Sequence, residues 1–228
     1  MESNPPKPIL YLITRGATAE TTTPASEEFR DIQIQVSTAV AAGIQLIQIR
    51  EKKLPARVLF ELTVSAVAIA RGSSTRILVN DRADVAAGAG ADGVHLTMRS
   101  LEPSLIRKMF GAKFLIGAST HSLAEAREAQ KGGANFAVFG PIFPTLTKER
   151  YGAPLGVDRL AEAVREMTPF PLIALGGISQ SNAWECLRAG ASGIAGISLF
   201  SEPSTLARTI KVISDLRKPD FTGVANEK

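Results

Sequence analysis

The sequence predicts a single α/β domain of the (β/α)8 TIM-barrel class, and three observations support this prediction. The 228 residues are 45% hydrophobic and 21% charged, which is ordinary for a globular domain. Short apolar runs alternate with longer helical patterns along almost the whole chain. A segment with a central glycine recurs before every second apolar run, so the repeating unit is two β/α modules.

The apolar runs are the predicted strands. Each is rich in Val, Ile, Leu or Phe and lacks strict alternation with polar residues, as parallel strands buried on both faces do. In order they are Ile9–Thr14, Leu46–Arg50, Ile77–Asp81, Gly93–Thr97, Phe114–Thr120, Phe136–Phe143, Leu172–Gly177 and Gly193–Ser198. Helical patterns lie between them, among others at Arg57–Arg71, Leu123–Lys131, Val157–Met167 and Gln180–Ala189. The barrel therefore spans residues 9–217, and we expect mobile tails over 1–8 and 218–228.

The recurring segment reads "AAGIQLIQI", "GAGADGVHL", "KGGANFAVF" and "RAGASGIAGI". Its glycines, Gly43, Gly90, Gly133 and Gly190, suit the left-handed position that ends a helix. An open doubly wound sheet is the alternative architecture. The barrel is favoured because no phosphate-binding glycine motif follows the first predicted strand.

Composition argues against several classes of protein. The net charge is +4, but basic and acidic residues are interspersed and no aromatic platform accompanies them, so nucleic-acid binding is not expected. The single Cys186 rules out an intramolecular disulfide and a cysteine-rich zinc site, and it reads as a small buried hydrophobe. No run approaches the roughly 18 apolar residues of a membrane helix, and the N-terminus lacks an apolar leader. A cytoplasmic protein without membrane contact is expected.

Polar residues gather at the carboxyl ends of the predicted strands, where the chemistry of barrels takes place. In chain order they are Gln48, Arg50 and Lys52; Asn80 and Asp81; His95 and Thr97; Ser119 and His121; Thr145, Thr147 and Lys148; Gly176 and Gly177; and Ile197 and Ser198. Their convergence at one mouth predicts a binding site.

Two anion sites are predicted at this mouth. Three cations, Arg50, Lys52 and Lys148, together with Asn80 and threonine hydroxyls, suit a strongly anionic substrate such as a pyrophosphate. Asp81 among these cations is most simply explained as a magnesium ligand. The segments after the seventh and eighth strands match the phosphate site common in barrels, in which backbone N–H groups hold a phosphate dianion.

Simpler structural roles stay open for several of these residues. Arg50 and Glu51 could form an ordinary ion pair at a strand end, and Asp81 could cap the helix that follows it. His95 fits a hydrogen-bonded histidine of the barrel interior better than a catalyst. The polar segment Arg15–Ser26 lacks periodicity and is either a loop or a mobile flap over the mouth.

The chain resembles the thiamine phosphate synthase family over roughly residues 9–216. The resemblance rests on "QIREK", "VNDRADVA", "GADGVHL", "GASTHSLAEA", "VFGPIFPTLTK", "YGAPLG", "IALGGI" and "GIAGIS". It implies a transferase of thiamine biosynthesis that couples 4-amino-2-methyl-5-hydroxymethylpyrimidine pyrophosphate with 4-methyl-5-(2-hydroxyethyl)thiazole phosphate. The products are thiamine phosphate and pyrophosphate.

The resemblance also implies residue roles. Gln48 and Ser119 would contact the pyrimidine, Arg50, Lys52, Asn80 and Lys148 would hold the pyrophosphate, and Asp81 would bind Mg²⁺. Thr145, Gly177, Ile197 and Ser198 would hold the thiazole phosphate, with Thr147 nearby. Lys148, Arg50 and Ser119 would act most directly in catalysis. The implied partners are these small-molecule substrates and, in a homo-oligomer, further copies of the chain.

The chain departs from the family pattern after the fourth strand. The family usually has Gly-Gln-Glu-Asp there, with a second magnesium ligand, whereas this chain has Thr97-Met-Arg-Ser100. Asp81 could hold the metal with water and pyrophosphate, or Arg99 could supply part of the charge. The alternatives are a sister activity, a thiazole tautomerase acting on thiazole phosphate carboxylate with His121 as proton shuttle, and a non-catalytic thiazole-phosphate-binding barrel. The synthase is favoured because Asn80-Asp81 and Thr145–Lys148 are intact.

Overall fold

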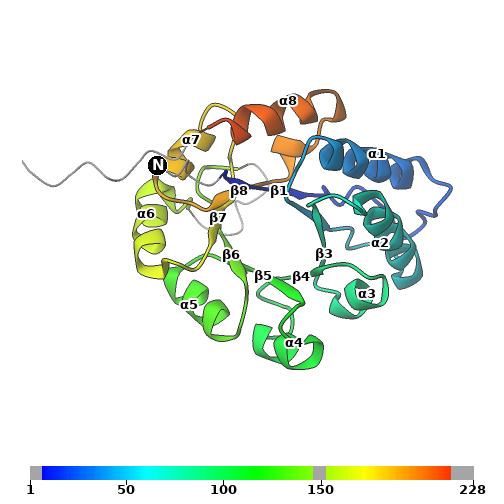
Figure 1. Cartoon of the computed structure of the whole chain (residues 1–228), viewed down its shortest axis with the longest axis horizontal. Coiled ribbons are helices and arrows are strands. Elements are labelled where there is room, and N and C mark those ends of the chain that lie inside the picture. Colours follow the sequence, from blue (N-terminus) through cyan, green and yellow to red (C-terminus); the bar gives the residue numbers. More distant parts are fainter. Residues whose placement is uncertain (1–6, 146–152, 217–228) are drawn as a thin grey trace, which may run out of the picture.

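Eight short apolar segments form a closed barrel of parallel strands in the order in which they occur in the chain (Figure 1). The computed structural model describes residues 7–145 and 153–216. The strands are β1 (Ile9–Ile13), β2 (Leu46–Ile49), β3 (Arg76–Asn80), β4 (Gly93–Leu96), β5 (Leu115–Thr120), β6 (Phe136–Phe139), β7 (Leu172–Ala174) and β8 (Gly193–Gly196). The predicted fold class is confirmed.

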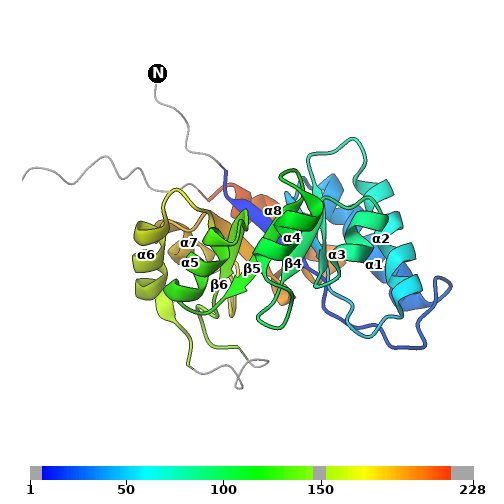
Figure 2. The same ribbon diagram turned by 90° about the horizontal axis from the view of Figure 1, so that it is seen from below.

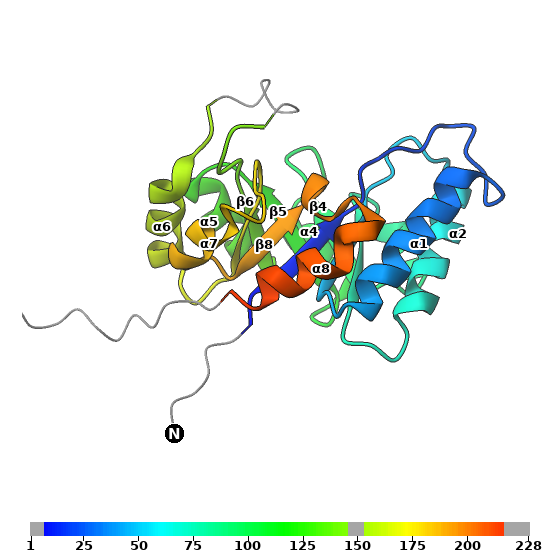
Figure 3. The ribbon, with the colours of Figure 1, turned by 90° about the horizontal axis from the view of Figure 1, so that it is seen from above.

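The helices lie outside the barrel and cover it as a ring (Figure 1). They are α1 (Glu27–Ala41), α2 (Ala56–Ala70), α3 (Ala83–Gly88), α4 (Pro103–Phe110), α5 (Leu123–Lys131), α6 (Gly156–Met167), α7 (Ala183–Arg188) and α8 (Pro203–Ser214), with a short 3-10 helix η2 (Ser198–Phe200) before α8. Figures 2 and 3 show the loops that follow the strands at one end of the barrel and those that precede them at the other. Among the described residues, no helix is both long enough and apolar enough to span a membrane.

The predicted strands mostly continue beyond the observed carboxyl ends. The strand predicted to reach Phe143 ends at Phe139, since the chain turns at Gly140 and Pro141 has no N–H to continue the ladder. Asp81, predicted as the last residue of a strand, has a left-handed backbone with φ of 60°. The polar residues at the mouth therefore stand on turns just past the strands. Apart from Lys7 and Pro8, the predicted tails lie outside the described residues.

The glycines of the recurring segment have the expected left-handed backbone. The φ angles of Gly43, Gly90, Gly133 and Gly190 are 80°, 73°, 86° and 91°. Each follows the end of a helix and precedes an even-numbered strand. The sequence repeat therefore marks equivalent helix ends in the barrel.

The barrel interior is filled by side chains that alternate with those facing the helices. Tyr11 and Phe136 stack edge to face, with ring centroids 5.7 Å apart, and His95 lies 5.7 Å from Tyr11. Gly117 makes room for this cluster, because a Cβ there would lie 2.4 Å from the Phe136 ring and 2.9 Å from His95 Nδ1. The interior is thus packed below the mouth rather than open.

The recurring segment also fixes the amino-terminal end of the barrel. Two residues after its glycine stands a polar residue whose side chain accepts a hydrogen bond from the first part of the preceding strand. The bonds are Leu10 N–H to Gln45 Oε1, Ile77 N–H to Asp92 Oδ2 and Ile116 N–H to Asn135 Oδ1, each 2.8 Å long. The backbone carbonyl at this position accepts from the next strand around the barrel: Gln45 from Arg76 N–H and Asp92 from Leu115 N–H, each at 2.9 Å, and Ser192 of the fourth copy from Ile9 N–H at 3.0 Å, which joins β8 to β1.

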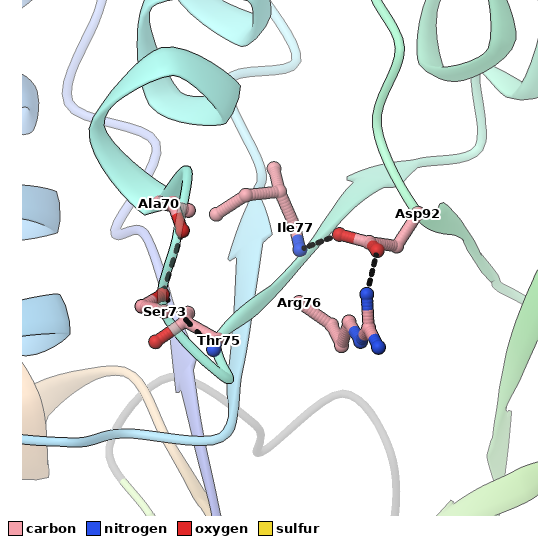
Figure 4. Close-up of polar contacts among 6 residues, drawn as sticks. All are labelled: Ala70, Ser73, Thr75, Arg76, Ile77 and Asp92. Carbon is pink, nitrogen blue, oxygen red and sulfur yellow. Dashed lines mark hydrogen bonds and ion pairs between the residues drawn. The ribbon is translucent and has the colours of Figure 1, made fainter.

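Figure 4 shows the second copy of this arrangement at the start of β3. Asp92 accepts from the Ile77 N–H with one oxygen and from Arg76 Nη1, at 2.9 Å, with the other. In the loop between α2 and β3, the Ser73 hydroxyl donates to the Ala70 carbonyl at 2.7 Å and accepts from Thr75 N–H at 3.1 Å. These polar groups satisfy one another within the chain.

Candidate active site

A cavity of about 490 Å³ lies at the carboxyl end of the barrel. Of the predicted site residues, Gln48, Arg50, Lys52, Asn80, Ser119 and Ile197 line it, together with His95, Thr97, Met98, Arg99 and His121. These residues come from β2, β3, β4, β5 and β8 or from the turns that follow them. These six predicted residues meet at one cavity, whereas Asp81, Thr145, Gly177 and Ser198 are not among its lining residues.

The wall of this cavity is cationic. Arg50, Lys52 and Arg99 line it, and none of its lining residues is a carboxylate. None of the three forms an ion pair with a residue of the described part of the chain. Because these three positive charges line one partly enclosed space, an anion bound there would be attracted by all of them.

Arg50 is positioned through its backbone. Its N–H donates to the Thr14 hydroxyl at 2.8 Å, and Thr14 N–H donates to the Gln48 carbonyl at 3.0 Å, so the ends of β1 and β2 are tied together. Thr14 is fully buried. No sequence pattern indicates this role of Thr14, because a threonine after an apolar strand has many structural uses.

Gln48 presents an unused hydrogen-bond donor. Its side chain is 1% exposed, and its Nε2 has no hydrogen-bond partner in the described part of the chain. Leaving a buried polar group without a partner costs about 1–3 kcal/mol. Because Gln48 lines the cavity, an acceptor on a bound ligand would relieve this cost.

Ser119 is held by a buried hydrogen-bonded chain. Tyr11 Oη lies 3.1 Å from His95 Nδ1, and His95 Nε2 lies 2.9 Å from Ser119 Oγ. Burial lowers the pKa of His95 to about 4, although the nearby Asp81 acts against this shift, and burial raises the pKa of Tyr11. A protonated phenol and a neutral imidazole can relay their hydrogen bonds so that the Ser119 hydroxyl donates into the cavity. His95 is thus the satisfied interior histidine that the sequence favoured.

The possible ion pair between Arg50 and Glu51 does not form. The Glu51 carboxylate is buried and accepts instead from Gly16 N–H at 3.1 Å and from the Thr18 N–H and hydroxyl, at 3.2 and 2.8 Å. Glu51 therefore fixes the loop after β1 to the end of β2. Sequence reasoning missed this role, since the partners are more than 30 residues away along the chain.

Asp81 binds the turn after β4. Its Oδ1 accepts from the Thr97 hydroxyl at 3.0 Å, from Thr97 N–H at 3.3 Å and from the Ser100 hydroxyl, while Oδ2 accepts from Asn80 Nδ2 at 2.6 Å. Asp81 does not cap α3, whose N-cap position is Arg82. The helix-cap alternative is therefore wrong.

The donor set fits Mg²⁺ poorly. Both oxygens of Asp81 already accept hydrogen bonds from its own chain, and the lining of the cationic cavity includes no carboxylate. Asp81 lines a separate, smaller cavity of about 230 Å³ that shares Lys52 and Asn80 with the first. Within residues 7–145 and 153–216, no group of three or more His, Cys, Asp and Glu side chains could hold a metal ion. The role of Asp81 as a magnesium ligand stays a prediction.

The turns after β6 and β7 lie against each other. Phe143 N–H donates to the Gly176 carbonyl at 2.9 Å, and a Cβ on Gly177, whose φ is 64°, would lie 2.4 Å from the Pro144 carbonyl oxygen. Thr145 follows directly and is partly exposed. Ser198 is exposed at the first residue of η2. Thr147 and Lys148 lie outside the described residues.

His121 begins the turn before α5. Its ring lines the cavity, its Nδ1 contacts the Gly140 carbonyl, and its N–H donates to Glu125 Oε2 at 2.6 Å. Ser122 caps α5 by accepting from Glu125 N–H at 3.2 Å, as predicted. His121 thus belongs to the cavity wall, and its backbone takes part in the helix start.

Comparisons with known proteins place the chain in one family. The family model described as thiamine monophosphate synthase matches residues 11–200. A thiamine-phosphate synthase of Chlorobium phaeobacteroides is 38% identical over 180 residues, covering 79% of this chain and 87% of the relative. That of Chlorobium luteolum is 37% identical over 214 residues, covering 92% and 95%.

A solved structure of similar sequence shares the fold. The thiamine phosphate pyrophosphorylase of Pyrococcus furiosus superposes with a TM-score of 0.71 at 30% identity, covering 90% of this chain and 96% of that one. The family model begins at Tyr11 within β1 and ends at Phe200, the last residue of η2, so it includes β2 to β8 in full. The chain therefore belongs to the thiamine monophosphate synthase family.

Proposed function

We propose that the protein acts as a thiamine-phosphate synthase. It transfers the pyrimidinylmethyl group of 4-amino-2-methyl-5-hydroxymethylpyrimidine pyrophosphate to the nitrogen of 4-methyl-5-(2-hydroxyethyl)thiazole phosphate. Thiamine phosphate and pyrophosphate are the products. Family membership supports this reaction, and the relatives quoted above carry the name of synthases rather than tautomerases.

The observation that carries the proposal is the cavity itself. Three cations without ion-pair partners among the described residues line it beside a buried amide donor that lacks a partner. A substrate that combines a diphosphate with a hydrogen-bonding heterocycle would satisfy both. A substrate without strong negative charge would leave the three cations unexplained.

The reaction asks mainly for electrostatic stabilisation. The bond between the pyrimidinylmethyl carbon and the pyrophosphate oxygen breaks, and its electron pair leaves with the pyrophosphate. The developing carbocation is delocalised into the aminopyrimidine ring, and the thiazole nitrogen then supplies the pair for the new bond. The attacking nitrogen carries no proton, so no general base is required. The enzyme neutralises the leaving group and aligns the two substrates.

Arg50, Lys52 and Asn80 hold the departing pyrophosphate in this account, and Lys148 joins them on the sequence evidence alone. Charge-assisted hydrogen bonds to the leaving oxygens strengthen as negative charge develops there. They therefore lower the free energy of the reaction's transition state more than that of the bound substrate. No step is assigned to a metal ion.

Gln48 and Ser119 orient the pyrimidine. The unpartnered Gln48 Nε2 donates to a ring or substituent acceptor, and the Ser119 hydroxyl, fixed by His95, supplies a second hydrogen bond. The phosphate of the thiazole lies on the opposite side of the mouth. Thr145, Gly177, Ile197 and Ser198 hold it there in this proposal, and Thr147 joins them on the sequence evidence alone.

A coupling assay tests the proposal. Purified protein incubated with both substrates and magnesium should release thiamine phosphate and pyrophosphate in equal amounts, and Gln48→Leu should lower the rate because it removes the pyrimidine donor. Isomerisation of thiazole phosphate carboxylate without coupling would favour the tautomerase, and binding of thiazole phosphate without turnover would favour the non-catalytic barrel. Either result overturns the proposal. A cytoplasmic location and a homo-oligomeric state stay predictions.

A further inference from the structure

The turn after β4 is organised around Asp81. Besides the bonds to Asp81, Ser100 N–H donates to the Thr97 carbonyl at 3.0 Å and the Ser100 hydroxyl accepts from Thr97 N–H at 2.7 Å. Thr97 and Ser100 therefore close a compact turn on one carboxylate oxygen. The two residues between them, Met98 and Arg99, project from this turn and line the cationic cavity.

The turn offers hydroxyl donors and no carboxylate beside Asp81. A hydroxyl that donates to Asp81 occupies a lone pair that a metal ion would otherwise use, and neither Thr97 nor Ser100 supplies an anionic oxygen of its own. At the same time the turn brings a guanidinium to the cavity. The turn thus supplies the cavity with one positive charge and with no anionic oxygen of its own.

Arg99 is exposed and has no carboxylate partner among the described residues. It shares the cavity wall with Arg50 and Lys52, which come from the end of β2 on the other side of β3. A planar guanidinium can bind two phosphate oxygens at once. Two guanidiniums, of Arg50 and Arg99, and the Lys52 ammonium around one cavity supply charge of the kind that a divalent ion would bring to a diphosphate.

We propose that Arg99 is a further substrate-binding residue, which with Arg50 and Lys52 neutralises the diphosphate without a requirement for a metal ion. Asp81 is the positioning residue for Arg99, since it holds the turn through Thr97 and Ser100. The identity of the diphosphate as the leaving group rests on the proposed function, but the anion site itself does not.

Direct binding of inorganic pyrophosphate to the full chain tests the role of Arg99. Calorimetric titration is carried out in EDTA, where no metal contributes. The wild type should bind, and Arg99→Gln should weaken binding about tenfold or more, the usual effect of losing one charge-assisted contact. Arg71→Gln is the matched control, because Arg71 is exposed at the end of α2 and does not line the cavity. It should bind as the wild type does.

The role of Asp81 is tested in the same metal-free titration. Asp81→Ala removes the acceptor for both hydroxyls and should weaken pyrophosphate binding, whereas Asp81→Asn keeps a carbonyl acceptor and should restore most of it. If Asp81 were only a metal ligand, Asp81→Ala would have the opposite effect in EDTA, since removal of a negative charge would leave pyrophosphate binding unchanged or tighten it.

Two results would overturn the inference: metal-free binding by Arg99→Gln equal to that of the wild type, or wild-type binding only when magnesium is present. The outcome is separate from that of the coupling assay. A protein that fails to couple the substrates but loses metal-free pyrophosphate affinity in Arg99→Gln refutes the proposed function and retains the anion site.

Discussion

The two ends of the barrel differ in whether their polar side chains have partners within the chain. At the amino-terminal end, Gln45, Asp92 and Asn135 each accept a hydrogen bond from a backbone N–H of the neighbouring strand. At the carboxyl end, the cations of the cavity lack ion-pair partners among the described residues, and the Gln48 amide nitrogen lacks a hydrogen-bond partner among them. The first end is complete without a ligand, whereas the second offers groups that a ligand would complete.

This difference separates stability from function. Paired groups that repeat with the β/α modules close the barrel, and their loss should lower the free energy of unfolding and leave catalysis intact. Unpaired polar and charged groups lower the stability of the ligand-free protein. This loss is tolerated where ligand binding requires those groups. Variants at the amino-terminal end should therefore change the free energy of unfolding, and variants at the carboxyl end should change turnover.

The largest effect is expected at the mouth. Arg50→Gln should lower the turnover of the coupling reaction about a hundredfold, as loss of a preorganised donor to a developing negative charge typically does. Steady-state kinetics and a urea denaturation curve together check this. A drop in turnover that merely follows a loss of folded protein would contradict the assignment.

At the opposite end, Asp92→Ala should lower the free energy of unfolding by about 1–3 kcal/mol, because the buried Ile77 N–H loses its acceptor. The turnover of the folded protein should stay within about twofold of the wild type, since the site is distant. Ser192→Ala is the internal control, because the fourth copy of the repeat uses its backbone carbonyl, and it should be far milder. Equal losses for the two variants would refute the role given to the repeat.

Lys148 lies outside the described residues, and its contact with the leaving pyrophosphate stays a prediction from the sequence. If it meets the leaving pyrophosphate, Lys148→Ala lowers turnover more than tenfold with an unchanged denaturation midpoint. Arg71→Gln, which removes one positive charge at the amino-terminal end, serves as the control. Unchanged kinetics in Lys148→Ala would remove the leaving-group role.

His95 links the mouth to the barrel interior and predicts a pH effect. Its pKa is about 4 in the folded protein against 6.5 without burial, so only the unfolded chain takes up a proton between these values. Stability from this group is full above pH 6.5 and falls as the pH is lowered toward 4, by up to about 1.4 kcal/mol per pH unit.

NMR titration checks this directly, because the chain has only two histidines. The His95 imidazole should stay neutral down to about pH 5. A His95 imidazole that titrates with an ordinary pKa would contradict the neutral hydrogen-bonded chain to Ser119.

Much of this molecule follows from the sequence. The apolar runs and the glycines of the repeat predict the barrel, since buried parallel strands and helix ends have local signatures. The site residues are predictable because strand ends share one edge, which is why Gln48, Arg50, Asn80 and Ser119 meet.

The contacts between these elements were not predictable. Glu51 binds a loop more than 30 residues away, Asp81 binds Thr97 and Ser100 on the neighbouring turn, and Tyr11 reaches His95 across the barrel interior. Each contact depends on strand register and on side-chain directions in three dimensions, which spacing along one chain does not encode.

The central claim is that the cations of the mouth bind a diphosphate, and thermal denaturation with added pyrophosphate tests it most directly. With magnesium present throughout, pyrophosphate should raise the melting temperature of the wild type and of Asp92→Ala, which starts lower, and should raise that of Arg50→Gln much less. A full shift in Arg50→Gln would mean that the diphosphate binds elsewhere and would contradict the account.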